Sequence, residues 1–210
     1  MERDQNVSSE ISAELPRLLR VAQGLTGSPR VGAELAETAV ATAGVERPAL
    51  YAALRRTIAE RELVERPLRV GKLMALPPSE RDAAAFVLLG GLSLRDAAAA
   101  CQTTETDLAQ RLVRAATGLA AVPIASSACT EPRRLRIVEG TVPDSARTHF
   151  VGCDACRDFD HALREELDRY ETPASIDAQP FVEAARRHEE ARVKAAAEAP
   201  PVTEPPAPRT

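Results

Sequence analysis

Apolar residues recur at helical spacing through most of this chain, and no other feature limits its possible folds so strongly. Near the N-terminus five of them form one stripe: Leu15, Leu18, Leu19, Ala22 and Leu25. Such spacing is typical of a helix that buries one face. The apolar share, 44% of the residues, is mostly Ala, Leu and Val, and only 3% of the residues are aromatic, which favours helix over sheet. No convincing alternation of apolar and polar residues predicts a strand. The expected fold is therefore all-α.

Proline and glycine divide the chain into parts. Pro67 and Gly71 interrupt the helical pattern and predict a linker. The last forty residues contain seven of the sixteen prolines, together with Ala and Glu. This composition predicts a largely disordered tail with one solvated helix around residues 181–199, in which His188 is also solvated. The predicted parts are residues 11–66, 76–122, 129–170 and the tail 172–210.

Charge and composition limit the function. The formal net charge is −4, so bulk charge does not favour non-specific binding to nucleic acid. No apolar run is long enough to cross a bilayer and the polar N-terminus is unlike a signal peptide, so we expect a cytoplasmic protein without a membrane partner. Four cysteines in a reducing compartment indicate metal or redox chemistry before disulfides. No phosphate-binding loop, nucleophile elbow or pair of carboxylates indicates an enzyme.

Residues 91–119, GLSLRDAAAACQTTETDLAQRLVRAATGL, predict two helices joined by a tight turn. Ser93 is a good N-cap for the first helix. The turn is expected near residues 101–103, with a second helix from about Thr104. That helix should bury three leucines: Leu108, Leu112 and Leu119. The pattern fits a helix-turn-helix whose second helix enters the major groove of DNA, and it fits equally well an ordinary helical hairpin in a bundle.

This block also resembles a known family. It begins with LPPSERDAAAFVLLGGLSL and continues with seven residues at matching positions: Asp96, Ala98, Leu108, Arg111, Leu112, Arg114 and Ala115. Residues 76–119 thereby resemble region 4 of the extracytoplasmic-function sigma factors, and LPRLLRVAQGLTGSPRVGAELAETAV resembles the start of their region 2. The resemblance implies two small helical lobes, contact with core RNA polymerase, and contact of Arg111 and Arg114 with promoter DNA.

The second helix departs from that family at the positions that would face DNA. Glu105 and Asp107 offset the charges of Arg111 and Arg114, so the helix is nearly neutral where phosphate contacts should be made. Gln102 stands where the turn usually has Gly, and a non-Gly residue at positive φ costs about 1 kcal/mol. The face of this helix that would contact DNA therefore lacks the net positive charge that DNA binding favours.

The N-terminal part is reduced as well. Tyr51 is the only aromatic residue before residue 76, whereas capture of unstacked bases favours aromatic side chains. The LPRLLRVAQGLTGS opening and the short first lobe resemble more closely the sigma-like domain of alphaproteobacterial general-stress-response regulators. That resemblance implies a sigma-factor mimic that binds an anti-sigma protein. Candidate partner contacts, in this case with core RNA polymerase, are Glu34, Leu35 and Glu37, which otherwise indicate only an ordinary amphipathic helix.

The segment HFVGCDAC contains a Cys-x-x-Cys pair, Cys153 and Cys156, at the start of a predicted helix. Two such thiolates can bind one ion, and His149, four residues earlier, is close enough to supply a third ligand. The pattern predicts a zinc site with a structural or redox-sensing role, because no general base accompanies it. The alternative is a pair of cysteines at a helix start without metal.

Residues 129–170 also resemble the zinc-binding anti-sigma family. In that family a fourth ligand lies upstream in the sequence, and the resemblance implies Cys129. His161 and Asp154 are alternatives for the fourth ligand. Cys101 is expected to lie buried beside the turn of the helix-turn-helix.

Three functions are consistent with these features. The first is a sigma-like transcription regulator that acts mainly through contacts with a sigma or anti-sigma protein and carries a metal- or redox-responsive module. The second is an active extracytoplasmic-function sigma factor with a fused zinc module, in which arginines contact the DNA backbone: Arg55, Arg56, Arg111, Arg114, Arg133, Arg134 and Arg136. The third is a metal-sensing binding module for which the other helices are only a scaffold.

Overall fold

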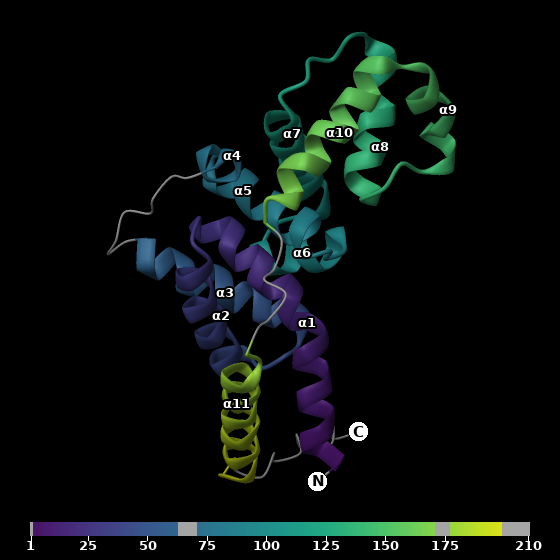
Figure 1. Ribbon diagram of the computed structural model, residues 1–210. Helices are drawn as coiled ribbons and strands as arrows, with labels where there is room; N and C mark the ends of the chain where they lie inside the picture. The colour runs from purple at the N-terminus through teal and green to yellow at the C-terminus, as the bar shows by residue number, and fades with distance from the viewer. Residues whose placement is uncertain (1, 63–70, 171–176, 199–210) are drawn as a thin grey trace, which may run out of the picture.

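The computed structural model (Figure 1) describes residues 2–62, 71–170 and 177–198, with the side chains of residues 9–61, 71–170 and 177–198. Within these ranges the chain forms helices joined by turns and has no strand, so the all-α prediction is confirmed. Most of the predicted linker and both ends of the predicted tail lie outside the described residues. In the part of the chain that is described, no helix combines the length and the apolar character needed to cross a bilayer.

Three helices form the N-terminal part: α1 (Glu2–Thr26), α2 (Pro29–Ala43) and α3 (Arg47–Glu62). The start of α2 follows from its sequence, because the Ser28 hydroxyl accepts a hydrogen bond from the N–H of Val31 and Pro29 occupies the first turn. The predicted stripe of α1 faces the core, where Leu15, Leu18, Ala22 and Leu25 are at most 3% exposed.

The second block contains α4 (Lys72–Ala75), α5 (Pro78–Ala84), a π-helical turn (Ala85–Leu89), α6 (Leu94–Cys101) and α7 (Glu105–Ala120). Ser93 and Thr104 cap α6 and α7, and each side chain accepts a hydrogen bond from a backbone N–H of the first turn. Gln102 between the two helices is left-handed, with φ 53° and ψ 48°. The three predicted leucines of α7 are buried: Leu108, Leu112 and Leu119. The predicted turn between two helices is confirmed.

One hydrophobic cluster joins the N-terminal helices to the second block. Tyr51 of α3 meets Phe86 of the π-helical turn edge to face, with 5.6 Å between ring centroids. The Tyr51 hydroxyl donates a hydrogen bond of 2.7 Å to Oε1 of Glu14, which is buried on α1. Because this cluster contains residues of both predicted lobes, the division into two lobes stays a prediction.

The C-terminal part begins with a 3-10 turn, η2 (Ser127–Cys129), followed by α8 (Thr130–Glu139), α9 (Asp144–Gly152) and α10 (Asp154–Asp168). Both α8 and α10 pack against α7, and the three helices lie side by side in Figure 1. Phe159 and Leu163 of α10 are fully buried in the main cluster. Helix α10 therefore fixes the C-terminal part to the second block.

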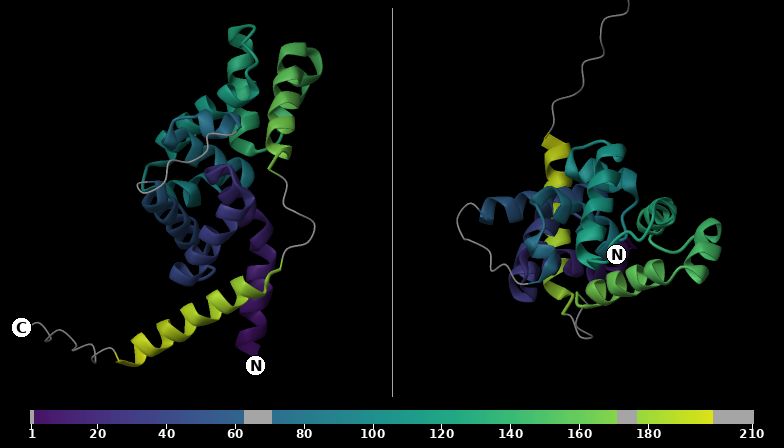
Figure 2. Two further views of the ribbon diagram at one scale, coloured as in Figure 1. Left: turned by 60° about the vertical axis from the view of Figure 1, so that its left-hand side comes forward. Right: turned by 90° about the horizontal axis from the view of Figure 1, so that it is seen from above.

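The prediction of a solvated tail helix is wrong for the first half of α11 (Gln179–Glu198), which is packed against the rest of the chain. Helix α11 packs against α2 and α1, and Figure 2 shows it crossing α1. Phe181 and Val182 are each 5% exposed, because the apolar residues of the first turns face the core while the charged residues that follow do not. His188, predicted to be solvated, is half-buried beside Gly44 at the end of α2. Residues 191–198 are exposed.

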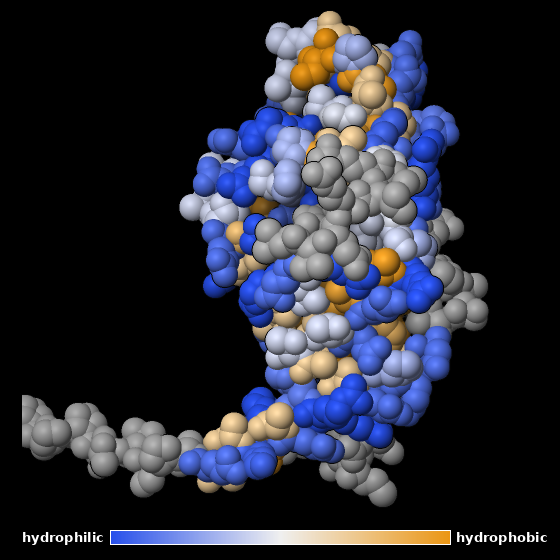
Figure 3. Space-filling view, turned by 90° about the vertical axis from the view of Figure 1, so that its left-hand side faces the viewer, coloured by the Kyte–Doolittle hydropathy of each residue, from blue (hydrophilic) through white to orange (hydrophobic). Residues whose placement is uncertain are grey.

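The described surface has few large hydrophobic side chains. Those that remain exposed among the described residues are Ile124, Val151 and Val193. On the face drawn in Figure 3, hydrophilic residues predominate and hydrophobic ones gather in small separate groups.

Candidate metal centre

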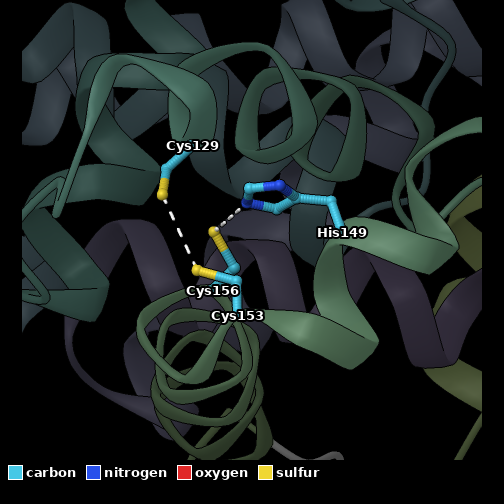
Figure 4. A group of neighbouring side chains, drawn as sticks. All are labelled: Cys129, His149, Cys153 and Cys156. Carbon is cyan, nitrogen blue, oxygen red and sulfur yellow. Dashed lines mark hydrogen bonds between the residues drawn. The ribbon is translucent and has the colours of Figure 1, made fainter.

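Four side chains from η2, α9 and α10 meet at the start of α10, and we refer to Cys129, His149, Cys153 and Cys156 as the Cys3His cluster. Cys129 ends η2, immediately before α8. His149 lies in α9, Cys153 is the N-cap of α10, and Cys156 is in the first turn of α10. Residues 140–143 form a non-helical connection between α8 and α9, and the packing of these two helices places Cys129 beside the other three residues. Figure 4 shows the four side chains pointing toward one another.

The distances within the cluster suit one metal ion. All four ligand atoms lie within 4.8 Å of one another. The Sγ atoms of Cys129 and Cys153 are 3.7 Å apart, and Sγ of Cys156 is 3.3 Å from Nε2 of His149. A tetrahedral zinc ion, with bonds of about 2.3 Å to sulfur and 2.0–2.1 Å to nitrogen, spaces its ligand atoms by roughly 3.5–3.8 Å. The cluster could therefore hold a metal ion after small side-chain movements.

The cluster is closed by a small apolar shell. Cys129 and Cys156 are at most 1% exposed, while His149 and Cys153 are half-buried. The shell contains Ala146 and Phe150 of α9, with Leu135 and Val142 packed beside them. Four protein ligands leave no open position on a tetrahedral ion, so the donor set suits a structural ion and not a hydrolytic one.

Hydrogen bonding and burial act differently on the cysteine thiols. The hydrogen bond with the Ser126 hydroxyl, 3.5 Å from Sγ, is the main cause that lowers the pKa of Cys129 to about 6. Burial raises the pKa of Cys156 to about 11, and the Arg133 guanidinium opposes that rise. A divalent ion favours the thiolate of every cysteine that binds it, so loading the cluster releases protons.

Arg133 is the main polar partner of the cluster. This residue of α8 is 4% exposed, and its Nε donates a hydrogen bond of 3.4 Å to Sγ of Cys156. Metal ligands are commonly oriented by such outer partners. The sequence offered one indication, because Arg133 follows Cys129 by four residues, or about one helical turn. From the sequence, Arg133 is predicted only as a possible contact to the DNA backbone.

The other candidate ligands lie outside the cluster. The imidazole of His161 is mostly exposed and lies 3.5 Å from Glu165. Asp154 pairs with Arg157 on the surface. Cys101 ends α6 and is buried, as predicted, and burial raises the pKa of its thiol to about 11. Of the four positions considered for the fourth ligand or a separate thiol, only Cys129 meets the other three residues.

The candidate DNA contacts on α7 are partly engaged within the chain. Nε of Arg114 donates a hydrogen bond of 2.8 Å to Oε1 of Glu80, and Arg111 is half-buried. The outward residues of α7, from Thr106 to Arg114, share a hollow of about 530 Å³ with Arg134 of α8. The C-terminal part therefore borders the face of α7 that would approach DNA.

The candidate partner contacts on α2 are also placed. Leu35 is buried in the core, so of these three candidates only the two glutamates could meet a partner that approached α2. Glu34 pairs with Arg30 and Arg61, at 3.2 and 3.5 Å. Glu37 lies 3.8 Å from Arg187 of α11, so α11 already contacts this part of α2.

Comparison of the chain with models of protein families, with curated proteins and with solved structures finds no significant match.

Proposed function

We propose that this chain is a sigma-factor-like transcription regulator that acts mainly through contacts with a sigma or anti-sigma protein. In this proposal residues 129–170 form a zinc-bearing module that responds to metal or to the redox state of its thiols. The proposal starts from the resemblance of residues 76–119 to sigma region 4 and from the resemblance of the Cys3His segment to zinc-binding anti-sigma proteins.

The observation that carries the proposal is that most of the arginines required for DNA binding already form contacts within the chain. Arg55 pairs with Asp82, Arg114 with Glu80, and Arg134 with Glu131. Arg133 and Arg136 are each 4% exposed. Phosphate contacts by Lys and Arg supply much of the affinity of a protein for DNA. Two of these arginines are buried, one is paired with a nearly buried carboxylate and two form surface ion pairs, so the chain offers few free cations to a duplex and is better suited to a protein partner.

The cluster supports the metal part of the proposal. Three thiols and one imidazole match the donor set of structural zinc sites, and a reducing compartment would keep the thiols available. When bound, zinc would join the start of α8, the end of α9 and the start of α10. Helices α8 and α10 also pack into the main core, whereas α9 buries residues only in the small cluster beside the site, so the ion would chiefly stabilise α9 and the two helix starts that it joins.

A second candidate is an active extracytoplasmic-function sigma factor with a fused zinc module. The observation that favours it is the geometry of α6 and α7, whose capped helices and tight turn match a helix-turn-helix. The two candidates differ in what α7 contacts, and they can be separated by transcription.

The test combines full-length, reduced, zinc-loaded protein with core RNA polymerase on a promoter library. The proposal predicts no promoter-specific initiation, together with recovery of a sigma or anti-sigma protein when the chain is purified from its native cells. Initiation that is lost in Arg111→Ala/Arg114→Ala but kept in Arg30→Ala, a control for an exposed arginine on α2, would establish the second candidate instead.

A further inference from the structure

The guanidinium of Arg133 binds two segments outside its own helix at once. At the start of α10 it reaches Sγ of Cys156 at 3.4 Å and the carbonyl oxygen of Ala155 at 2.7 Å. In the connection after α7 it donates to the carbonyl oxygens of Val122 and Pro123, at 2.9 and 3.0 Å. The side chain itself belongs to α8. One buried side chain therefore contacts the Cys3His cluster and the exit of the helix-turn-helix.

The contacts use nearly the full capacity of this side chain. A guanidinium has five N–H donors, and four hydrogen bonds are made here. Its plane also lies over the ring of Phe159, with 4.7 Å between Cζ and the ring centroid. A buried charge is costly unless it is fully paired, so this environment holds Arg133 in one orientation.

Arg136, one turn later on the same helix, shows what is particular to Arg133. It is equally buried, but it binds Asp160 of α10 and the carbonyl oxygen of Gly140, both within the C-terminal part. Among the described residues, its hydrogen bonds reach neither the cluster nor the connection after α7. The two arginines share their burial and helix, and differ in the segments that they join.

We infer that Arg133 is a positioning residue that couples metal occupancy of the Cys3His cluster to the exit of α7. This inference rests on the metal site of the proposed function. A bound ion would tie Cys156 to Cys129, which precedes Arg133 by one turn, and so would hold α10 and α8 in the spacing that the guanidinium bridges. Loss of the ion frees Sγ of Cys156, loosens the bridge, and releases the connection at Val122 and Pro123.

The test is hydrogen exchange of the full chain with bound Zn²⁺ and after its removal by a chelator, read at the last turn of α7 and at residues 121–126. In the wild type, removal of zinc should speed exchange in these segments as well as around the cluster. Arg133→Lys keeps the charge but cannot bridge several acceptors. This variant should bind Zn²⁺ about tenfold more weakly, and at saturating Zn²⁺ the exit of α7 should exchange as fast as in the zinc-free wild type.

Arg136→Lys is the matched control and should keep the zinc-dependent protection of the α7 exit. Equal loss of that protection in both variants would overturn the inference, because it would indicate only general loosening of α8. A wild type that binds Zn²⁺ without any change at the α7 exit would overturn the inference alone and leave the proposed metal site standing. A wild type that binds no Zn²⁺ would overturn both. The wild-type comparison needs no variant, so a misfolded Arg133→Lys does not decide the outcome.

Discussion

Nε of Arg55 on α3 lies 2.7 Å from Oδ2 of Asp82 on α5, and this ion pair joins the N-terminal helices to the second block. The hydrogen bond to Asp82 is the main cause that raises the pKa of Arg55. Asp82 is 8% exposed, so loss of Arg55 would leave its carboxylate in a poorly solvated position. This pair therefore links residues 11–66 and 76–122, which the sequence predicts to be separate parts.

Arg55→Met should lower the free energy of unfolding by about 1–3 kcal/mol, because it removes a charged partner from a nearly buried carboxylate. Urea denaturation measures this change. Arg56→Met is the control, since Arg56 is exposed on the same helix, and it should change stability by no more than about 0.5 kcal/mol. Equal effects of the two substitutions would show that the ion pair contributes nothing specific.

Gln102 gives a test of backbone strain in the turn before α7. It is exposed and left-handed, so Gln102→Gly should relieve strain of about 1 kcal/mol, partly offset by the greater freedom of glycine in the unfolded chain. Gln102→Val should be destabilising, because a β-branched residue tolerates positive φ poorly. Thermal unfolding compares the two. A valine variant as stable as the glycine variant would contradict the left-handed conformation.

Both tyrosines should lose their protons at a higher pH in the folded protein than in the unfolded chain. Burial is the main cause that raises the pKa of Tyr51, with the hydrogen bond to Glu14 second, and burial also raises the pKa of Tyr170. The unfolded chain then holds fewer protons than the folded chain above about pH 10, so the free energy of unfolding should fall as pH rises beyond that value. Absorbance of tyrosinate measures the titration directly, because the chain has no Trp. Ionisation near pH 10 in a chain that is still fully helical would contradict the buried positions, and urea-unfolded protein provides the reference.

The identity of the fourth ligand can be tested by elemental analysis of reduced protein. We expect one zinc ion per chain, lost in Cys129→Ser, because removing a ligand should weaken binding more than the roughly 10–100-fold cost of losing an outer partner. Cys101→Ser and His161→Gln should keep zinc, since both residues lie outside the cluster. Zinc retained in Cys129→Ser and lost in His161→Gln would reverse the assignment.

The buried residues in the first turns of α11 should hold this helix against the core. Phe181→Ala should cost about 3 kcal/mol and expose α11 to proteolysis, because Phe181 is 5% exposed. Val193→Ala, on the exposed half of the same helix, should have little effect. Limited proteolysis with mass analysis of the fragments distinguishes the two. Equal resistance of the two variants would show that α11 is held by other contacts.

Local sequence was sufficient for features that depend on neighbouring residues. Ser93 and the leucines of α7 were predicted because capping and helical periodicity act over a few residues. Three members of the Cys3His cluster were predicted from their spacing in HFVGCDAC. The fourth, Cys129, required the resemblance to a known family, because its approach to His149 depends on how α8 and α9 pack.

Features made by long-range packing were not predicted. In the sequence Arg133 is an ordinary basic residue, and its contacts depend on carbonyl oxygens ten and twenty-two residues away. The docking of α11 was missed because only Phe181 and its near neighbours interrupt a strongly charged helix. Pairing of Arg55 with Asp82 likewise depends on the contact between two blocks.

The central proposal, that the chain acts through protein contacts and that α7 does not bind DNA, is tested most directly by fluorescence anisotropy of a random pool of labelled duplexes. Zinc-loaded full-length protein is titrated at low salt and then at increasing salt. The account predicts no saturable binding at micromolar protein, and no further change when Arg111 and Arg114 are replaced by Ala. Saturable binding that weakens steeply with salt, and is lost in Arg111→Ala/Arg114→Ala, would contradict it.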